Sequence, residues 1–250
     1  MAAETPHLRD TNTMNHPSDP ASIDASEARD ATRARPASLA WPIAAALGLG
    51  GFALMTVLIA GHTVFPFDQP LLEAGQRLSP YMDAWRGLSD SANFPLIAVG
   101  VAIVLGLLAF RRWREAVVVV VLLIAVTAGS EIVKQLVARP RPPGYDESTV
   151  GIVYSFPSGH VLEAVTMYGI IAVLVWRSSL PTVLRVLIPL LFTVIVVLVA
   201  IARVAVAAHY PSDVLASAFG GLGCVALFAW SVAILERRRA RPRSAPERGE

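Results

Sequence analysis

Polar side chains with catalytic potential gather in three short stretches of an otherwise apolar sequence. The last stretch holds His209 and Asp213, whose spacing of four residues places both on one face of a helical turn. A carboxylate that accepts a hydrogen bond from an imidazole fixes the ring tautomer and makes the other nitrogen a better nucleophile or base. A purely structural contact is the plain alternative. A metal site would need more histidines or carboxylates nearby, and the sequence supplies none.

Three cations in these stretches can converge on one phosphoryl group. Lys134 and Arg141 belong to the first stretch, and Arg203 stands six residues before His209. An arginine offers a fork for two oxygens, and a lysine adds a point charge. Prolines follow both Arg139 and Arg141, so this segment is predicted to end a helix and to continue in an extended conformation.

The middle stretch, Pro157-Ser158-Gly159-His160, predicts the start of a helix. Ser158 is a good N-cap residue, and Gly159 allows a close approach of the backbone. The free N–H groups at a helix N-terminus bind anions readily. The same pattern also fits an ordinary capped helix, so its interpretation as an anion site depends on the cations elsewhere in the sequence.

The elements that position these groups are predicted to be membrane helices. Apolar residues make up 54% of the 250 residues and charged residues only 16%, with a mean hydropathy of +0.56. Soluble domains carry about 25% charged residues, so a soluble domain is excluded. The single cysteine, Cys224, excludes a disulfide framework and a cysteine-rich zinc site, and we expect no nucleic-acid partner. Six apolar runs cover residues 39–61, 94–110, 116–133, 161–176, 186–202 and 214–235.

These runs predict an all-α membrane protein with a bundle of six transmembrane helices. The fourth run is short and contains Glu163, and it becomes long enough if its helix starts near Ser158. We expect residues 1–38 to be a disordered cytoplasmic tail, 39–235 to be the membrane domain, and 236–250 to be a basic cytoplasmic tail. The loop 62–93 is predicted to hold one or two amphipathic helices on the membrane surface, broken near Pro80. This loop could be a surface-packed linker, a lid or a ramp for lipid entry.

Arginines indicate how the helices are oriented. Fourteen fall in residues 29–38 close to the first apolar run, the loops 111–115 and 177–185, and the C-terminal tail, whereas six Lys or Arg residues fall on the opposite side. The positive-inside rule therefore predicts that both termini are cytoplasmic. All three polar stretches then lie on the outer face.

The three stretches resemble the motif set of the type 2 phosphatidic acid phosphatase family, integral-membrane lipid phosphatases related to vanadium haloperoxidases. The family motifs are Lys, six residues, Arg-Pro; then Pro-Ser-Gly-His; then Ser-Arg, five residues, His, three residues, Asp. The matching residues here are Lys134 with Arg141-Pro142, Pro157-Ser158-Gly159-His160, and Arg203, His209 and Asp213. The sequence departs from the family at one position, where Ala202 replaces the usual serine.

The resemblance implies a role for each matching residue. His209 would be the nucleophile that forms a phosphohistidine, Asp213 would orient it, and His160 would be the general acid and then the general base. The phosphoryl oxygens would be held by Lys134, Arg141, Ser158, Gly159 and Arg203. Three cations can take the place of magnesium ions in phosphoryl transfer, so no metal and no other cofactor is implied.

The expected function is hydrolysis of a lipid phosphate or diphosphate at the outer face of a bacterial cytoplasmic membrane. Polyprenyl diphosphate is the favoured substrate. The alternatives are phosphatidic acid or phosphatidylglycerol phosphate, a lipid-linked sugar phosphate, and a non-enzymatic lipid-binding or transport protein on the same scaffold. The histidine–aspartate pair argues against a binding protein, which would not need a nucleophile.

Overall fold

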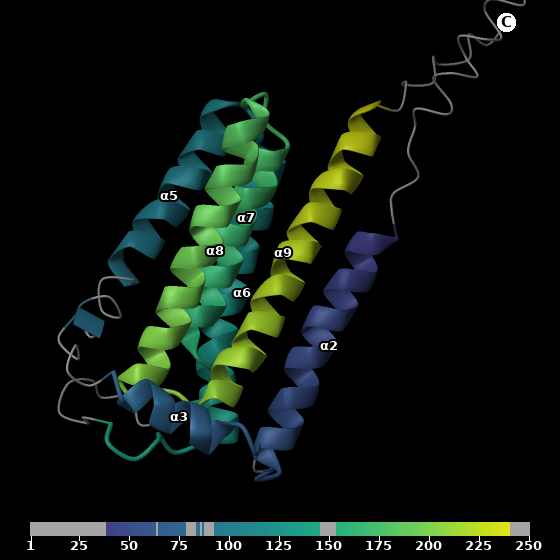
Figure 1. Ribbon diagram of the computed structural model, residues 1–250. Coiled ribbons are helices and arrows are strands. Elements are labelled where there is room, and N and C mark those ends of the chain that lie inside the picture. The colour runs from purple at the N-terminus through teal and green to yellow at the C-terminus, as the bar shows by residue number, and fades with distance from the viewer. Residues whose placement is uncertain are drawn as a thin grey trace, which may run out of the picture. The chain divides into compact units, whose positions relative to one another are not determined.

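The computed structural model describes residues 39–63, 65–78, 84–85, 87, 93–145 and 154–240, so the two predicted tails lie largely outside it. The elements within it are helices (Figure 1), and the only extended pairing in the described residues is an isolated bridge between Pro140 and Tyr154. The prediction of an all-α fold is therefore confirmed. The helices are α2 (Ala40–Ala60), α3 (Asp68–Gln76), α5 (Asn93–Ala109), α6 (Trp113–Val137), α7 (Gly159–Trp176), α8 (Thr182–Ala205) and α9 (Pro211–Ala240).

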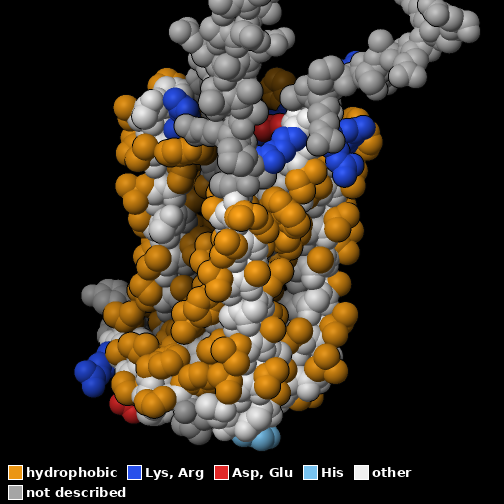
Figure 2. Space-filling view, turned by 90° about the vertical axis from the view of Figure 1, so that its right-hand side faces the viewer, with side chains coloured by type: hydrophobic (Ala, Val, Ile, Leu, Met, Phe, Trp, Pro, Cys, Tyr) orange, Lys and Arg blue, Asp and Glu red, His pale blue; other side chains and the backbone are white. Residues whose placement is uncertain are grey.

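Five helices, α2, α6, α7, α8 and α9, are long and apolar enough to cross a membrane. α5 is apolar but has 17 residues, at the short end of the ~17–25 that a crossing helix needs. α7 begins at Gly159 directly after Ser158, which gives the fourth apolar run the length predicted for it. On the face that Figure 2 shows, hydrophobic side chains cover the length of the bundle, and most of the visible Lys and Arg side chains lie at the end where α9 ends. The chain is thus a multi-pass membrane protein.

α9 lies between α2 and the rest of the bundle, since its main contacts are with α2 on one side and with α7 on the other. Against α2 the two backbones nearly touch: a Cβ added to Gly48 would lie 2.6 Å from the backbone nitrogen of Gly223. Small residues allow this close approach between membrane helices. Further along, Phe228 and Val232 of α9 are fully buried in a core cluster with Ile170 of α7. α9 therefore links the outer helix α2 to the centre of the bundle.

The connections α6–α7 and α8–α9, together with α3, lie at one end of the bundle, which we call the site end (Figure 1). α3 lies across this end and confirms the predicted helix in the first long loop, whereas the break expected near Pro80 lies outside the described residues. The opposite end carries the connections α5–α6 and α7–α8, and we call it the arginine end. There α9 continues beyond the predicted boundary at residue 235 and includes Arg237, Arg238 and Arg239 before it ends at Ala240.

Candidate active site

His209 is buried at the site end, in the short connection between α8 and α9. Its Nδ1 lies 2.5 Å from the backbone oxygen of Ser155, to which it donates a hydrogen bond. A ring that donates from Nδ1 carries its lone pair on Nε2. The Ser155 carbonyl therefore selects the tautomer in which Nε2 is free to act as a nucleophile or base.

Asp213 lies beside His209, but the hydrogen bond predicted between them is wrong. Asp213 Oδ2 is 4.0 Å from His209 Nδ1. α9 begins at Pro211, so His209 precedes the helix and the pair does not share a helical turn as the spacing had suggested. The carboxylate instead accepts from the backbone N–H of Tyr210 at 2.9 Å and from Arg139 Nη1 at 2.5 Å. Asp213 can therefore act on the imidazole through its charge, while the carbonyl orients the ring.

The electrostatic surroundings keep His209 neutral. Burial lowers its pKa well below the usual 6.5, and the positive charges of Arg203 and Arg141 lower that pKa further. The hydrogen bond to the Ser155 carbonyl acts in the opposite direction but does not outweigh burial. Because only the neutral ring has a lone pair on Nε2, the site holds His209 in its nucleophilic form.

The start of α7 presents two polar atoms that have no hydrogen-bond partner among the described residues. The backbone N–H of Ser158 donates to Ser217 Oγ at 2.9 Å, and Ser217 donates to the Asp213 carbonyl at 2.7 Å, so α7 is anchored to α9. Ser158 is the N-cap residue, as predicted, but its hydroxyl makes no capping bond. Within the described part of the chain, Ser158 Oγ and His160 Nε2 are buried without a hydrogen-bond partner.

Three cations surround the start of α7. Lys134 stands in the last turn of α6, and its Nζ is 3.8 Å from where a Cβ on Gly159 would lie, so the glycine leaves room beside the ammonium. Arg203 is buried in the last turn of α8. Arg141 donates from Nη1 to the Ala208 carbonyl at 2.8 Å. The charges of these three residues all act on His160, so the structure brings the predicted groups to one place.

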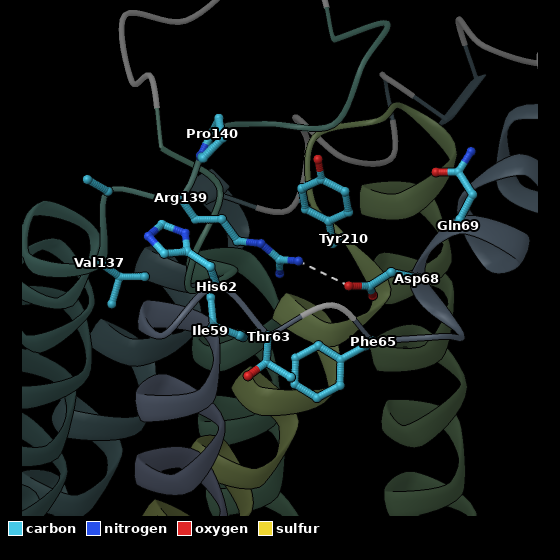
Figure 3. A pocket seen from close by; sticks show the side chains of 11 residues that line it. Ile59, His62, Thr63, Phe65, Asp68, Gln69, Val137, Arg139, Pro140 and Tyr210 are labelled. Atoms are coloured by element: carbon cyan, nitrogen blue, oxygen red, sulfur yellow. Dashed lines mark hydrogen bonds and ion pairs between the residues drawn. The ribbon is translucent and has the colours of Figure 1, made fainter.

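Reasoning from the sequence missed two charged residues next to this cluster. Arg139 Nη2 lies 3.0 Å from Asp68 Oδ2 (Figure 3). The Nη1 atom of Arg139 binds Asp213. The side chains of Arg139 and Asp68 line a cavity of about 330 Å³ that also includes His62 and Tyr210. Arg139 was visible as a second arginine in the first stretch. Nothing in the sequence indicated a role for Asp68, because no spacing rule connects it to Arg139, which is 71 positions away.

Lys134 also has an acidic neighbour that the spacing alone did not reveal. Glu131, one turn earlier on α6, lies 2.6 Å from Lys134 Nζ. The side chain of Glu131 is half exposed, whereas that of Lys134 is buried. An exposed carboxylate is solvated easily, so Glu131 can release the ammonium to a phosphoryl oxygen at little cost.

Comparison with known proteins shows which family matches the region that carries these residues. The family model of the PAP2 superfamily matches residues 115–237, the region that contains all three motifs. This region of the chain is therefore that of a PAP2 superfamily protein, similar to the type 2 phosphatidic acid phosphatases. Among solved structures, the crystal structure of a transmembrane PAP2-type phosphatidylglycerolphosphate phosphatase from Bacillus subtilis is similar, with a TM-score of 0.62 and 21% identity over 78% of this chain and 100% of that one. No curated protein matches the sequence significantly.

Proposed function

We propose that the chain removes phosphate from a membrane lipid through a phosphohistidine on His209. The observation that carries this proposal is the pair of buried atoms without a partner among the described residues, Ser158 Oγ and His160 Nε2. Each such atom costs about 1–3 kcal/mol, so we expect a polar ligand to complete this site. Because the surrounding groups are cations, a phosphoryl group suits them. The match to the PAP2 superfamily supports the same class of reaction.

In the first step, Nε2 of His209 attacks phosphorus as the bond from phosphorus to the lipid oxygen breaks. His160 donates its proton to that oxygen, and a phosphorus–nitrogen bond now joins the phosphoryl group to His209. In the second step, His160 takes a proton from water, and the resulting hydroxide attacks phosphorus. The phosphorus–nitrogen bond breaks, inorganic phosphate leaves, and both histidines return to their initial states.

The cations would supply the charge stabilisation that this reaction needs. Lys134, Arg141 and Arg203 would bind the equatorial oxygens, with help from the Ser158 hydroxyl and the Gly159 N–H. In most phosphoryl-transfer sites, metal ions neutralise the charge that develops on these oxygens. Here the side chains can do so alone, so we expect activity to persist in EDTA. Vanadate, which resembles the pentacoordinate transition state, should inhibit it.

Polyprenyl diphosphate is the substrate that we favour. A terminal diphosphate carries up to about three negative charges and a phosphate monoester up to about two, so three cations match the diphosphate better. The second candidate is phosphatidylglycerol phosphate, because the similar Bacillus subtilis protein is a phosphatidylglycerolphosphate phosphatase. Measured turnover on the two lipids decides between them.

We further propose six membrane spans, with α5 as the sixth, and an active site on the outer face of a bacterial cytoplasmic membrane. The support is the excess of arginines at the arginine end and the apolar character of all 17 residues of α5 except Asn93, Pro95 and its glycines. A cysteine placed in loop 143–151, in a Cys224→Ala background, should react with a membrane-impermeant thiol reagent in intact cells. A cysteine at 111–115 should not react. The reverse pattern would overturn this topology.

The experiment that tests the function is phosphate release by the purified protein from a panel of lipid substrates. The panel contains a polyprenyl diphosphate, phosphatidylglycerol phosphate, phosphatidic acid and a lipid-linked sugar phosphate, each compared by kcat/KM with and without EDTA. Turnover in EDTA, highest on the diphosphate, would support the full proposal. Turnover that EDTA abolishes and magnesium restores would refute the cation mechanism. A complete lack of phosphate release would favour a lipid-binding protein.

A further inference from the structure

A buried ionic network connects α3 to the first turn of α9. Its centre is Arg139, which donates from Nη1 to Asp213 Oδ1 at 2.5 Å and to Ser212 Oγ at 2.8 Å, and from Nη2 to Asp68 Oδ2 at 3.0 Å. The three parts of this network come from α3, from the connection after α6, and from α9. The PAP2 motifs that were matched in the sequence include Asp213 but neither Arg139 nor Asp68.

Asp68 also caps α9 from a distant part of the chain. The backbone N–H of Ser212 donates to Asp68 Oδ1 at 2.7 Å, and the Ser212 hydroxyl donates to Oδ2 at 2.7 Å. The first N–H groups of a helix have no partner within the helix and carry its positive end, so a carboxylate placed there is stabilising. Asp68 supplies that carboxylate to a residue 144 positions later.

The network holds the segment that carries His209. Tyr210, the next residue, donates its N–H to Asp213, and the ring of Tyr210 stacks on Arg139 with 4.1 Å between Cζ and the ring centroid. The segment from His209 to Asp213 is thus fixed through Asp213, Ser212 and Tyr210 by side chains outside it. A displacement of 1 Å at a reacting group can cost about 100-fold in rate.

We propose that Asp68 and Arg139 are positioning residues for His209, so that helix α3 is part of the active site. This inference rests on the proposed phosphatase function. Both terminal nitrogens of Arg139 already bind carboxylates, so Arg139 has little capacity to hold a phosphate. The pair should therefore affect kcat through the position of the nucleophile and leave the affinity for substrate nearly unchanged.

The test compares variants of the network with matched controls in the purified full-length protein. Asp68→Asn removes the charge and keeps the shape, and Arg139→Lys keeps the charge but removes the fork that bridges two carboxylates. Glu73→Gln makes the same acid-to-amide change on α3 at an exposed residue that accepts a hydrogen bond from Gln69 on the same helix. Arg177→Lys at the arginine end is the control for the second variant.

We expect Asp68→Asn and Arg139→Lys each to lower kcat by about 10- to 100-fold with KM changed less than about threefold. The controls should stay within about twofold of wild type in both constants. The double variant should be no slower than the slower single variant, because residues that act as a unit are not additive. Hydrogen exchange in the peptide 209–217 should be faster in Asp68→Asn than in Glu73→Gln.

Each remaining outcome contradicts part of the proposal. An unchanged kcat in both network variants, or a loss confined to KM, would refute the positioning role, as would additive losses in the double variant. If Asp68→Asn does not fold, the test relies on Arg139→Lys, which retains the buried charge. A lower kcat with a nearly unchanged KM in this variant would then support the positioning role. A wild-type protein without turnover on any lipid phosphate would refute the proposed function and the inference with it. An active wild type with normal network variants would refute the inference alone.

Discussion

Both ends of the bundle contain a buried carboxylate that arginines bind, but the two ends are built differently. At the arginine end, Glu115 is paired with Arg112 one turn away and lies 3.8 Å from Arg239, and these arginine side chains are 33% and 45% exposed. At the site end, Asp213 is paired with Arg139, whose side chain is only 16% exposed. One carboxylate is therefore bound by solvated cations and the other by a cation that is itself buried.

The difference shows which end is complete without a ligand. Solvated arginines can adjust to water and to one another, so the pairs of Glu115 require nothing further. At the site end three cations converge near two polar atoms that lack partners among the described residues, Ser158 Oγ and His160 Nε2. A buried polar atom without a partner costs about 1–3 kcal/mol, so a polar ligand would stabilise this end. We therefore expect substitutions at the site end to affect turnover and those at the arginine end to affect stability alone.

The largest expected effect is that of His209→Ala, which removes the proposed nucleophile. Activity should fall by at least about 1,000-fold on every substrate, because a catalytic nucleophile and its supporting groups act as one unit. The measurement is kcat/KM on a lipid monophosphate and on a diphosphate, together with trapping of ³²P-labelled protein in acid-free gels. Wild-type protein should carry an acid-labile label and the variant should not. Turnover near the wild-type rate would refute the covalent mechanism.

The next effect is that of His160→Ala, and it should depend on the leaving group. A lipid alkoxide leaves poorly without a proton, whereas the phosphate that leaves from a diphosphate is a much weaker base. General acid catalysis contributes about 10²–10⁴-fold, and less as the leaving group improves. The variant should therefore lose much more kcat/KM on a monophosphate than on a diphosphate of the same lipid. Equal losses on the two substrates would contradict the role of general acid.

The sequence predicted the parts of the molecule that depend on local patterns. Apolar runs located the helices, and Ser158 correctly marked the start of α7, because the signals for both lie within a few adjacent residues. Spacing within motifs also located the cations and histidines that meet at the site end. Each of these inferences needed only residues of one helix or one loop, or a family resemblance that had already linked the motifs.

Apart from the Glu131–Lys134 pair within α6, the contacts that the sequence did not reveal join distant segments. Asp68 binds Ser212 across 144 positions, and the Ser155 carbonyl replaces Asp213 as the partner of His209. The second error arose because Pro211 starts α9 two residues after His209, so a spacing of four did not mean one helical turn. Backbone carbonyls are present at every position and leave no mark in a sequence.

A smaller effect is expected at Ala202, where the family usually has serine. Ala202 is fully buried in α8 next to Arg203, so a serine hydroxyl there adds at most one hydrogen bond near the site. Such a bond contributes about 0.5–1.5 kcal/mol, and Ala202→Ser should change kcat/KM by about tenfold or less in either direction. The measurement is made on the best substrate of the panel. A change of several hundredfold would mean that the pocket around Arg203 differs from that of the family.

The pH dependence tests the electrostatic surroundings of His209. The proposed nucleophile, His209, would act in its neutral form, and burial with Arg203 and Arg141 lowers its pKa well below 6.5. As pH falls, His209 therefore stays neutral through 6.5, and kcat/KM on a diphosphate should decline only below that pH. An unperturbed histidine would already have lost about half of the activity at pH 6.5. A diphosphate is used as the substrate because its leaving group depends little on protonation by His160. The ionisation of the substrate is measured separately by ³¹P NMR.

The smallest effect on turnover is expected for Glu115→Gln at the arginine end. The amide keeps the shape of the buried side chain but leaves Arg112 and Arg239 without their carboxylate. Breaking a fully buried pair costs about 3–5 kcal/mol, but these arginines are partly solvated, so we expect about 1 kcal/mol and a lower Tm in detergent. Because the pair lies at the opposite end from His209, kcat and KM should stay within about twofold of wild type at a temperature below both transitions. A tenfold loss of kcat with the protein still folded would show that the two ends are coupled through α6 or α9, and the contrast between a completed end and a catalytic end would then not hold.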